Sequence, residues 1–130
     1  MAAIEPAVRD LAGRANFATL SVLLSSGQPM THVMWVDADE DHVLINTEVH
    51  RAKFRAVERD PRVTVTIWER DDPYSYAEIR GRVVETIRGQ EARAHIDALS
   101  RKYRGCDYDP AAITSERVIL RIAPEAQYVH

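Results

Sequence analysis

The sequence predicts a mainly β protein, an antiparallel barrel of six or seven short strands with about three short helices. Three observations lead to this prediction. Short apolar segments recur along the chain, and several alternate with polar residues at a period of two. Turns rich in Gly, Pro, Asp and Ser separate them, and few stretches carry helical spacing. A chain of 130 residues is long enough for one domain and too short for two, so we expect a single domain over residues 1–130.

The first part of the chain predicts one helix and three strands. Pro6 suits the first turn of a helix and Gly13 suits its end, and apolar residues three and four apart lie between them. Strands follow at residues 17–24, 30–36 and 43–45, with turns at 25–29 and 37–42. Strands joined by such short turns pair as antiparallel hairpins.

The second part predicts two more helices and three more strands. A helix of about two and a half turns follows residue 51. It stops before Pro61, which has no N–H and disfavours the α region for the residue before it. Strands are expected at residues 63–68, 76–83 and 118–122, and a longer helix at residues 91–103. Gly81 interrupts the clean alternation of its strand, which predicts a bulge or a sharp bend.

Composition argues against several classes of function. A net charge of −3 disfavours a nucleic-acid-binding surface, and no apolar run approaches the roughly 20 residues of a membrane span. Cys106 is the single cysteine, which excludes an internal disulfide and fits a reducing compartment. The first six residues lack the basic and apolar regions of a signal peptide. We therefore expect a cytoplasmic protein.

The most informative segment is Leu44–Arg55, where a strand, a turn and the start of a helix follow one another. The strand ends in the small polar residues Asn46 and Thr47, and Arg51 and Lys53 stand where the helix begins. The free N–H groups and the positive dipole end of that helix point at the same corner. Together these groups predict an anion site, which a cofactor phosphate would suit. The alternative is a basic helix start that is merely solvated.

Aromatic and histidine side chains near this segment have two interpretations each. Trp35 and Trp68 lie in strands with one apolar face, so each is either the wall of a ring-binding pocket or a packing residue. His50, beside the basic corner, is either a cofactor contact or a surface histidine.

Metal binding and the common hydrolytic chemistries find little support. Four acidic residues match positions 1, 3, 5 and 12 of a calcium loop: Asp37, Asp39, Asp41 and Glu48. However, His42 occupies the position where that loop needs glycine, so we interpret the segment as a solvated acidic turn. The histidines and the cysteine show no zinc-ligand spacing, and no catalytic-serine or phosphate-loop motif is present.

Several segments, in this order, resemble the flavin- and deazaflavin-binding split-barrel family, which includes the pyridoxamine 5'-phosphate oxidase-like proteins. The matching pieces are Asn46–Thr47, Arg51–Arg55, Arg59–Val65, Tyr76–Val83 and Arg117–Ile122, which cover nearly the whole domain. More narrowly, they resemble the actinobacterial branch of that family, which uses coenzyme F420.

The resemblance implies a split β-barrel homodimer with two cofactor sites at the subunit interface. In such a dimer, Arg51 and Lys53 would bind the cofactor phosphate or its acidic tail. Asn46 and Thr47 would form hydrogen bonds nearby.

The implied chemistry is hydride transfer between the cofactor ring and a small organic acceptor, as in an F420-dependent reductase. The strand Val33-Met34-Trp35 would run along the ring system, and Trp68 would close the pocket. Because the cofactor carries the reactive atom, positioning would supply most of the catalysis. FMN is the alternative cofactor, since it also brings a phosphate, although the polyglutamate tail of F420 suits the basic pair better. A protein that carries F420 without turnover is a further alternative.

Overall fold

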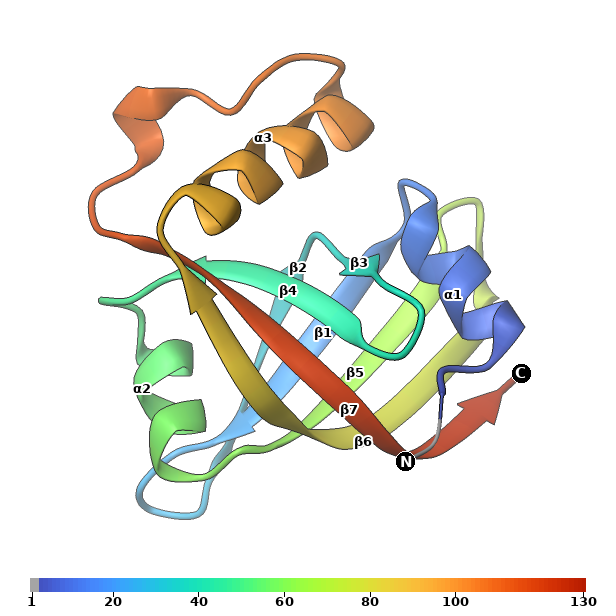
Figure 1. Ribbon diagram of the computed structural model, residues 1–130. Helices are drawn as coiled ribbons and strands as arrows, with labels where there is room; N and C mark the ends of the chain where they lie inside the picture. Colours follow the sequence, from blue (N-terminus) through green and yellow to red (C-terminus); the bar gives the residue numbers. More distant parts are fainter. Residues whose placement is uncertain (1–2) are drawn as a thin grey trace.

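The computed structural model describes residues 3–130, which form one seven-stranded antiparallel sheet curled into a half-barrel (Figure 1). The strands are β1 (Phe17–Leu23), β2 (Pro29–Met34), β3 (Asp37–Ala38), β4 (Val43–Glu48), β5 (Arg62–Glu69), β6 (Asp72–Arg88) and β7 (Arg117–Val129). The helices are α1 (Pro6–Gly13), α2 (Ala52–Arg59) and α3 (Gln90–Arg104), with a 3-10 turn, η1, at Pro110–Ala112. The predicted mainly β split-barrel fold is confirmed. Residues 1–2, which begin the segment assessed for a signal peptide, lie outside the described residues.

The sheet order is β2-β1-β5-β6-β7-β4-β3, so β2 and β3 are its edges. β6 and β7 are longer than predicted, with 17 and 13 residues, and they pair from Ala77↔Val129 to Arg88↔Val118. Residues 84–86 of β6 are all exposed, so the alternation that identifies a half-buried strand disappears there. For this reason the sequence revealed only the part of β6 that covers the core.

The connection between β2 and β4 also differs from the prediction. β2 ends at Met34, two residues earlier than expected, and residues 37–38 form a short strand against β4 where a turn was expected. In the turn that follows, the Asp39 carboxylate accepts hydrogen bonds from the amides of Asp41 and His42, at 2.9 and 2.8 Å. Asp39 therefore caps this turn, whereas Asp37 and Glu48 of the same acidic spacing make contacts elsewhere.

The main core fills the inside of the curled sheet. Its largest fully buried side chains come from alternate positions of five strands: Leu20, Val22, Val43, Ile45, Val65, Ile67, Ile79, Leu120 and Ile122. Val8 and Leu11 of α1 cover one part of this core. Phe54 and Val57 of α2 cover another part of the core, as predicted from their three-residue spacing.

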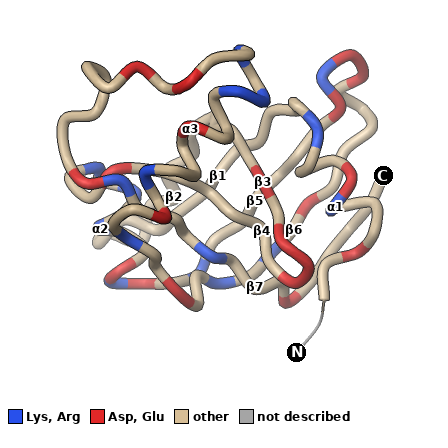
Figure 2. Tube along the Cα trace, turned by 45° about the horizontal axis from the view of Figure 1, so that its top comes forward, with Lys and Arg blue, Asp and Glu red and all other residues tan. Residues whose placement is uncertain are grey.

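Basic and acidic residues are interspersed along the trace (Figure 2).

The third helix packs on the opposite face of the sheet. Leu44 of β4, Ala92 of α3 and Ile119 of β7 form a second apolar cluster there. The helix ends at Gly105, whose φ of 79° is in the left-handed region that glycine adopts without a steric penalty. α3 thus forms a roof over the outer face of β4 and β7 (Figure 1).

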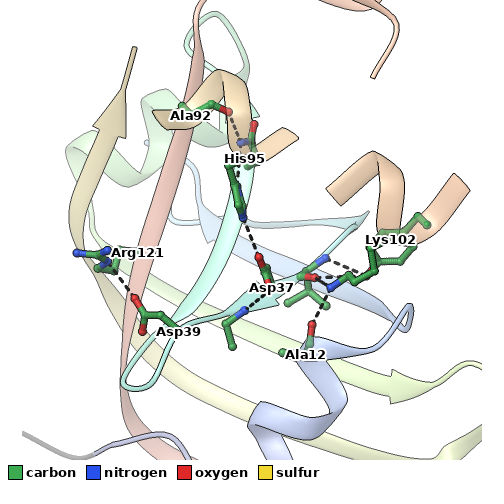
Figure 3. Close-up of polar contacts among 11 residues, drawn as sticks. Ala12, Asp37, Asp39, Ala92, His95, Lys102 and Arg121 are labelled. Atoms are coloured by element: carbon green, nitrogen blue, oxygen red, sulfur yellow. Dashed lines mark hydrogen bonds and ion pairs between the residues drawn. The ribbon is translucent and has the colours of Figure 1, made fainter. Parts of the chain in front are cut away.

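Lys102 attaches the C-terminal end of α3 to the rest of the molecule. Its ammonium group donates hydrogen bonds to the carbonyl of Ala12 at 2.9 Å and of Val36 at 2.6 Å (Figure 3). Burial lowers the pKa of Lys102, and the nearby Asp37 carboxylate opposes that shift. The lysine connects α3 to α1 and to the segment between β2 and β3.

Gly81 allows β6 and β7 to approach each other closely at the bend of the sheet. The register of the pair shifts between Arg80 and Gly81, as the sequence predicted. A Cβ atom added at residue 81 would lie 2.1 Å from the carbonyl oxygen of Ala123, which belongs to the backbone. The position therefore requires glycine because of space.

Glu48 fastens the end of β4 to the loop that enters β7. Its side chain is buried, and Oε1 accepts hydrogen bonds from the amides of Thr114 and Ser115 at 2.7 and 3.1 Å. Desolvation alone would raise the pKa of Glu48. These hydrogen bonds and the charge of Arg117 outweigh that effect, so the pKa lies below its ordinary value.

Gly81→Ala should destabilise the protein by about 1–3 kcal/mol, because the new methyl group forces the backbone of β7 away. Chemical denaturation would measure the change in the free energy of unfolding. Gly13→Ala is the control, since a Cβ at residue 13 meets no atom within 4 Å. Equal stability of the two variants would contradict the close approach of the strands.

Glu48→Gln should cost about 1–3 kcal/mol of stability at neutral pH, because it removes a buried charge that accepts hydrogen bonds. The folded pKa is depressed, so this stabilisation is present above the ordinary value of 4.5 and is lost as the pH falls below it. The stability difference from wild type should therefore shrink in acid. The exposed Glu58→Gln, measured by the same denaturation series, should change stability little at any pH.

Candidate functional site

A cavity of about 290 Å³ lies beneath α3, against the ends of β2, β4 and β7. Four residues predicted from the sequence line it: Val33, Met34, Trp35 and Asn46. Six further lining residues were not predicted: Phe17, Ile96, Leu99, Arg104, Tyr108 and Arg117. The lining combines aromatic rings, aliphatic side chains and two guanidinium groups, which suits a planar ligand that carries negative charge.

Trp35 forms an aromatic wall of this cavity. Its ring stacks on Tyr103 of α3, with centroids 5.0 Å apart and planes 5° apart, and Tyr108 meets it edge-on at 6.2 Å. The Arg104 guanidinium lies over the Trp35 ring at 5.2 Å. The hydroxyl of Tyr103 accepts a hydrogen bond from the Val36 amide at 3.1 Å, which fixes the ring behind Trp35.

The aromatic row continues away from the cavity to Trp68. Phe17 packs 6.0 Å from Tyr103, and Trp68 packs 6.4 Å from Phe17 on the far side. Phe17 lines the cavity, whereas Trp68 does not. Within this chain, Trp68 therefore supports the aromatic wall only indirectly, by packing against Phe17.

Three cations gather where α2 begins. Arg51 is the N-cap of the helix, and no side chain caps the helix amides. Burial lowers the pKa of Lys53, and the charges of Arg51 and Arg117 lower it further. Within residues 3–130, Lys53 forms no ion pair and no side-chain hydrogen bond. The corner holds positive charge and free helix amides, which is the arrangement that binds phosphate and carboxylate groups.

Glu48 compensates this charge only in part. Its Oε2 lies 3.9 Å from Arg51 and 3.8 Å from Arg117, beyond hydrogen-bond distance from either guanidinium. Burial lowers the pKa of Arg117, and the Arg51 charge acts in the same direction. The cluster therefore has room for a further negative charge.

Asn46 connects the cavity to α3. Its Oδ1 accepts a hydrogen bond from Nε of Arg117 at 2.8 Å. Its Nδ2 lies 3.0 Å from the carbonyl oxygen of Ala92 and 3.0 Å from Nδ1 of His95. His95 Nε2 in turn lies 3.0 Å from the Asp37 carboxylate (Figure 3).

Thr47 and His50 lie at the edge of this arrangement. Thr47 alternates with Asn46 along β4, so its side chain shares the inner face with Ile45 of the core. β3 pairs only with Val43 and Leu44, so among the described residues one backbone edge of the later part of β4 has no partner strand. His50 is exposed, and its Nδ1 lies 2.5 Å from Oγ of Ser115.

Arg117 is a charged lining residue of the cavity that the sequence did not indicate. It comes immediately before an apolar strand, where an arginine commonly faces solvent, and nothing in its neighbours indicates burial. Its role arises from the pairing of β4 with β7, which places it directly opposite Glu48. A buried arginine of this kind has no local sequence signal.

Residues 3–130 contain neither a membrane-spanning helix nor a metal-binding cluster. No helix in that range combines the length and the apolar character needed to cross a membrane. In the same range, no three or more His, Cys, Asp or Glu side chains are grouped so that they would hold a metal ion.

Comparison with solved structures places the chain among split barrels of several functions. An F420 reductase is 27% identical, with a TM-score of 0.81 over 92% of this chain and 94% of that chain. A putative pyridoxamine 5'-phosphate oxidase from Listeria innocua is 20% identical, with a TM-score of 0.65 over 92% and 90%. A heme storage protein from Vibrio cholerae is 9% identical, with a TM-score of 0.65 over 98% and 95%. The last two likenesses establish the fold alone.

No curated protein sequence matches the chain. The family model described as pyridoxamine 5'-phosphate oxidase, in contrast, matches residues 4–130. This match covers the strands and helices that build the cavity and the cation cluster. The chain therefore belongs to the pyridoxamine 5'-phosphate oxidase family.

Proposed function

We propose that the protein binds coenzyme F420 and transfers a hydride between its reduced form and a small organic acceptor. The observation that carries this proposal is the cluster of Arg51, Lys53 and Arg117, whose charge is not fully compensated, beside a cavity with aromatic walls. Family membership and the likeness to an F420 reductase support the same cofactor class.

The residues present fit this cofactor. Arg51 and Lys53 would hold its phosphate or its acidic tail, with Arg117 as a third cation. The segment Val33-Met34-Trp35 would lie along the ring system, and the unpaired edge of β4 at Thr47 would offer backbone hydrogen bonds.

We assign secondary roles at the cofactor site to the two remaining predicted residues, His50 and Trp68. His50 lies next to the basic corner, close enough to Glu48 for its charge to help lower the pKa of that carboxyl. Trp68 would close the pocket of a partner subunit in the homodimer that the family resemblance implies.

Bound F420 supplies the hydride chemistry. The residues of this chain would bind the anionic part, Trp35 would face the ring, and Tyr108 and α3 would exclude water from the cavity. Positioning of this kind supplies most of the rate enhancement when the reactive atom belongs to the cofactor. Tyr108, whose ring lines the cavity, is the hydroxyl-bearing side chain among the lining residues.

Lys53→Ala and Arg51→Ala should each weaken F420 binding by about 1–3 kcal/mol, because each removes a charge-assisted contact. Fluorescence titration of purified variants would measure the dissociation constants. Arg55→Ala is the matched control, since Arg55 lies on the same helix and faces solvent. Unchanged affinity in both test variants would refute the proposed anion site.

The same titration with FMN tests the alternative cofactor. Membership of a family that binds flavin-type cofactors supports this alternative. We expect tighter binding of F420, since its polyglutamate tail adds negative charge opposite the cation cluster. A protein that purifies yellow with a flavin spectrum, or that binds FMN more tightly, would instead assign it as an FMN oxidoreductase.

Turnover distinguishes an enzyme from an F420 carrier. Reduced F420 incubated with the protein and a quinone or an enone should be oxidised faster than without protein, as followed by the return of F420 absorbance. Tight binding with no acceleration across such acceptors would favour the carrier.

A further inference from the structure

A partly buried chain of hydrogen bonds runs from β3 through α3 and β4 to the start of β7. It links Asp37, His95, Asn46 and Arg117 in that order. We propose that Asp37, His95 and Asn46 are positioning residues, which hold the guanidinium of Arg117 toward the cavity for contact with the anionic part of the ligand. The inference rests on the proposed function, because it assigns Arg117 to that ligand.

The donors and acceptors of this chain determine one another. An arginine only donates, so the atom of Asn46 that faces Nε of Arg117 must be its oxygen. The amide nitrogen of Asn46 then faces Ala92 and His95 and donates to both. Nδ1 of His95 must therefore accept, which leaves the imidazole proton on Nε2, directed at the Asp37 carboxylate.

The charge of Asp37 supports this arrangement. Desolvation opposes ionisation of Asp37, but several contacts together outweigh it, and the hydrogen bond from His95 is the largest of them. The pKa of Asp37 therefore lies below its ordinary value. An ionised carboxylate attracts the Nε2 proton and so keeps Nδ1 free to accept. Figure 3 shows His95 on α3 pointing down at Asp37 on β3.

This hydrogen-bond chain determines the direction in which the Arg117 guanidinium points. Its side chain is 9% exposed, and Nε is held by Asn46 while Nη1 stays 3.8 Å from the Glu48 carboxylate. Without the Asn46 oxygen, the guanidinium would be free to close that gap and form a direct ion pair with Glu48. Such a pair would neutralise the charge that the ligand needs. The chain therefore keeps Arg117 available.

Nitrogen-15 NMR of the wild-type protein tests the core of this inference without any ligand or activity. Histidine ring nitrogens differ in chemical shift according to whether they carry a proton. We expect His95 near neutral pH to carry its proton on Nε2 alone. A proton on Nδ1 would overturn the proposed chain.

Two variants of His95 test its effect on binding. His95→Gln offers one acceptor and one donor in place of the imidazole, whereas His95→Phe offers neither. We expect His95→Phe to weaken F420 binding about tenfold and His95→Gln to stay within about threefold of wild type. In an Arg117→Ala background, His95→Phe should have no further effect, because its influence passes through Arg117.

Asn46→Asp provides a second route if His95→Phe does not fold. A carboxylate at residue 46 accepts from Arg117 but cannot donate to His95, and its charge pairs with the guanidinium. We expect weaker F420 binding and a proton on Nδ1 of His95. Wild-type affinity in this variant would contradict the proposal.

The outcomes separate this inference from the proposed function. If wild type binds neither F420 nor FMN, the proposed function fails, and with it the role of Arg117. If wild type binds F420 and Lys53→Ala weakens binding, but His95→Phe does so equally with and without Arg117, only the positioning chain is overturned.

Discussion

The pairing of β4 with β7 is the constraint on which the site depends. Its register places Glu48 directly opposite Arg117. Side chains two residues apart on a strand share a face, so Asn46 joins this pair beneath α3. The buried carboxylate satisfies the amides of the loop before β7 and leaves its second oxygen near two guanidinium groups. One strand register thus both attaches the loop before β7 to β4 and brings the cations of the candidate anion site together.

The electrostatic character of that corner follows from this division of labour. Oε1 of Glu48 is used by the backbone, and Oε2 stands nearly 4 Å from Arg51 and Arg117, so it stabilises both guanidiniums without pairing closely with either. Lys53 shares the corner and has no acidic partner within residues 3–130. Lys53 and Arg117 are at least partly buried while Arg51 is exposed, so solvent stabilises this excess of positive charge only in part, and a bound anion would stabilise it further.

The roof of α3 supplies the other half of the site. Lys102 ties its C-terminal end to two backbone carbonyls, and Tyr103 presents a fixed ring against which Trp35 stacks. The same helix carries His95 into the chain that ends at Arg117. Because a single helix orders both the aromatic wall and the polar chain, the aromatic part and the cationic part of the cavity have a defined relation to each other.

The sequence by itself determined the local structure and the basic corner. Alternation identified the strands where one face is buried, Gly81 marked the bend, and Arg51 and Lys53 at the start of α2 indicated an anion site. These features depend on residues close together in the chain. Periodicity could not reveal the distal part of β6, because its side chains are exposed on both faces.

Only the tertiary structure decided that Arg117 is buried beside Asn46. Seventy-one positions separate these two residues, and strand pairing alone brings their side chains within 2.8 Å. The same holds for His95 on α3, whose spacing indicated nothing beyond a helix surface. A hydrogen-bond chain across four elements has no local signal, since each member acquires its partner from a different part of the fold.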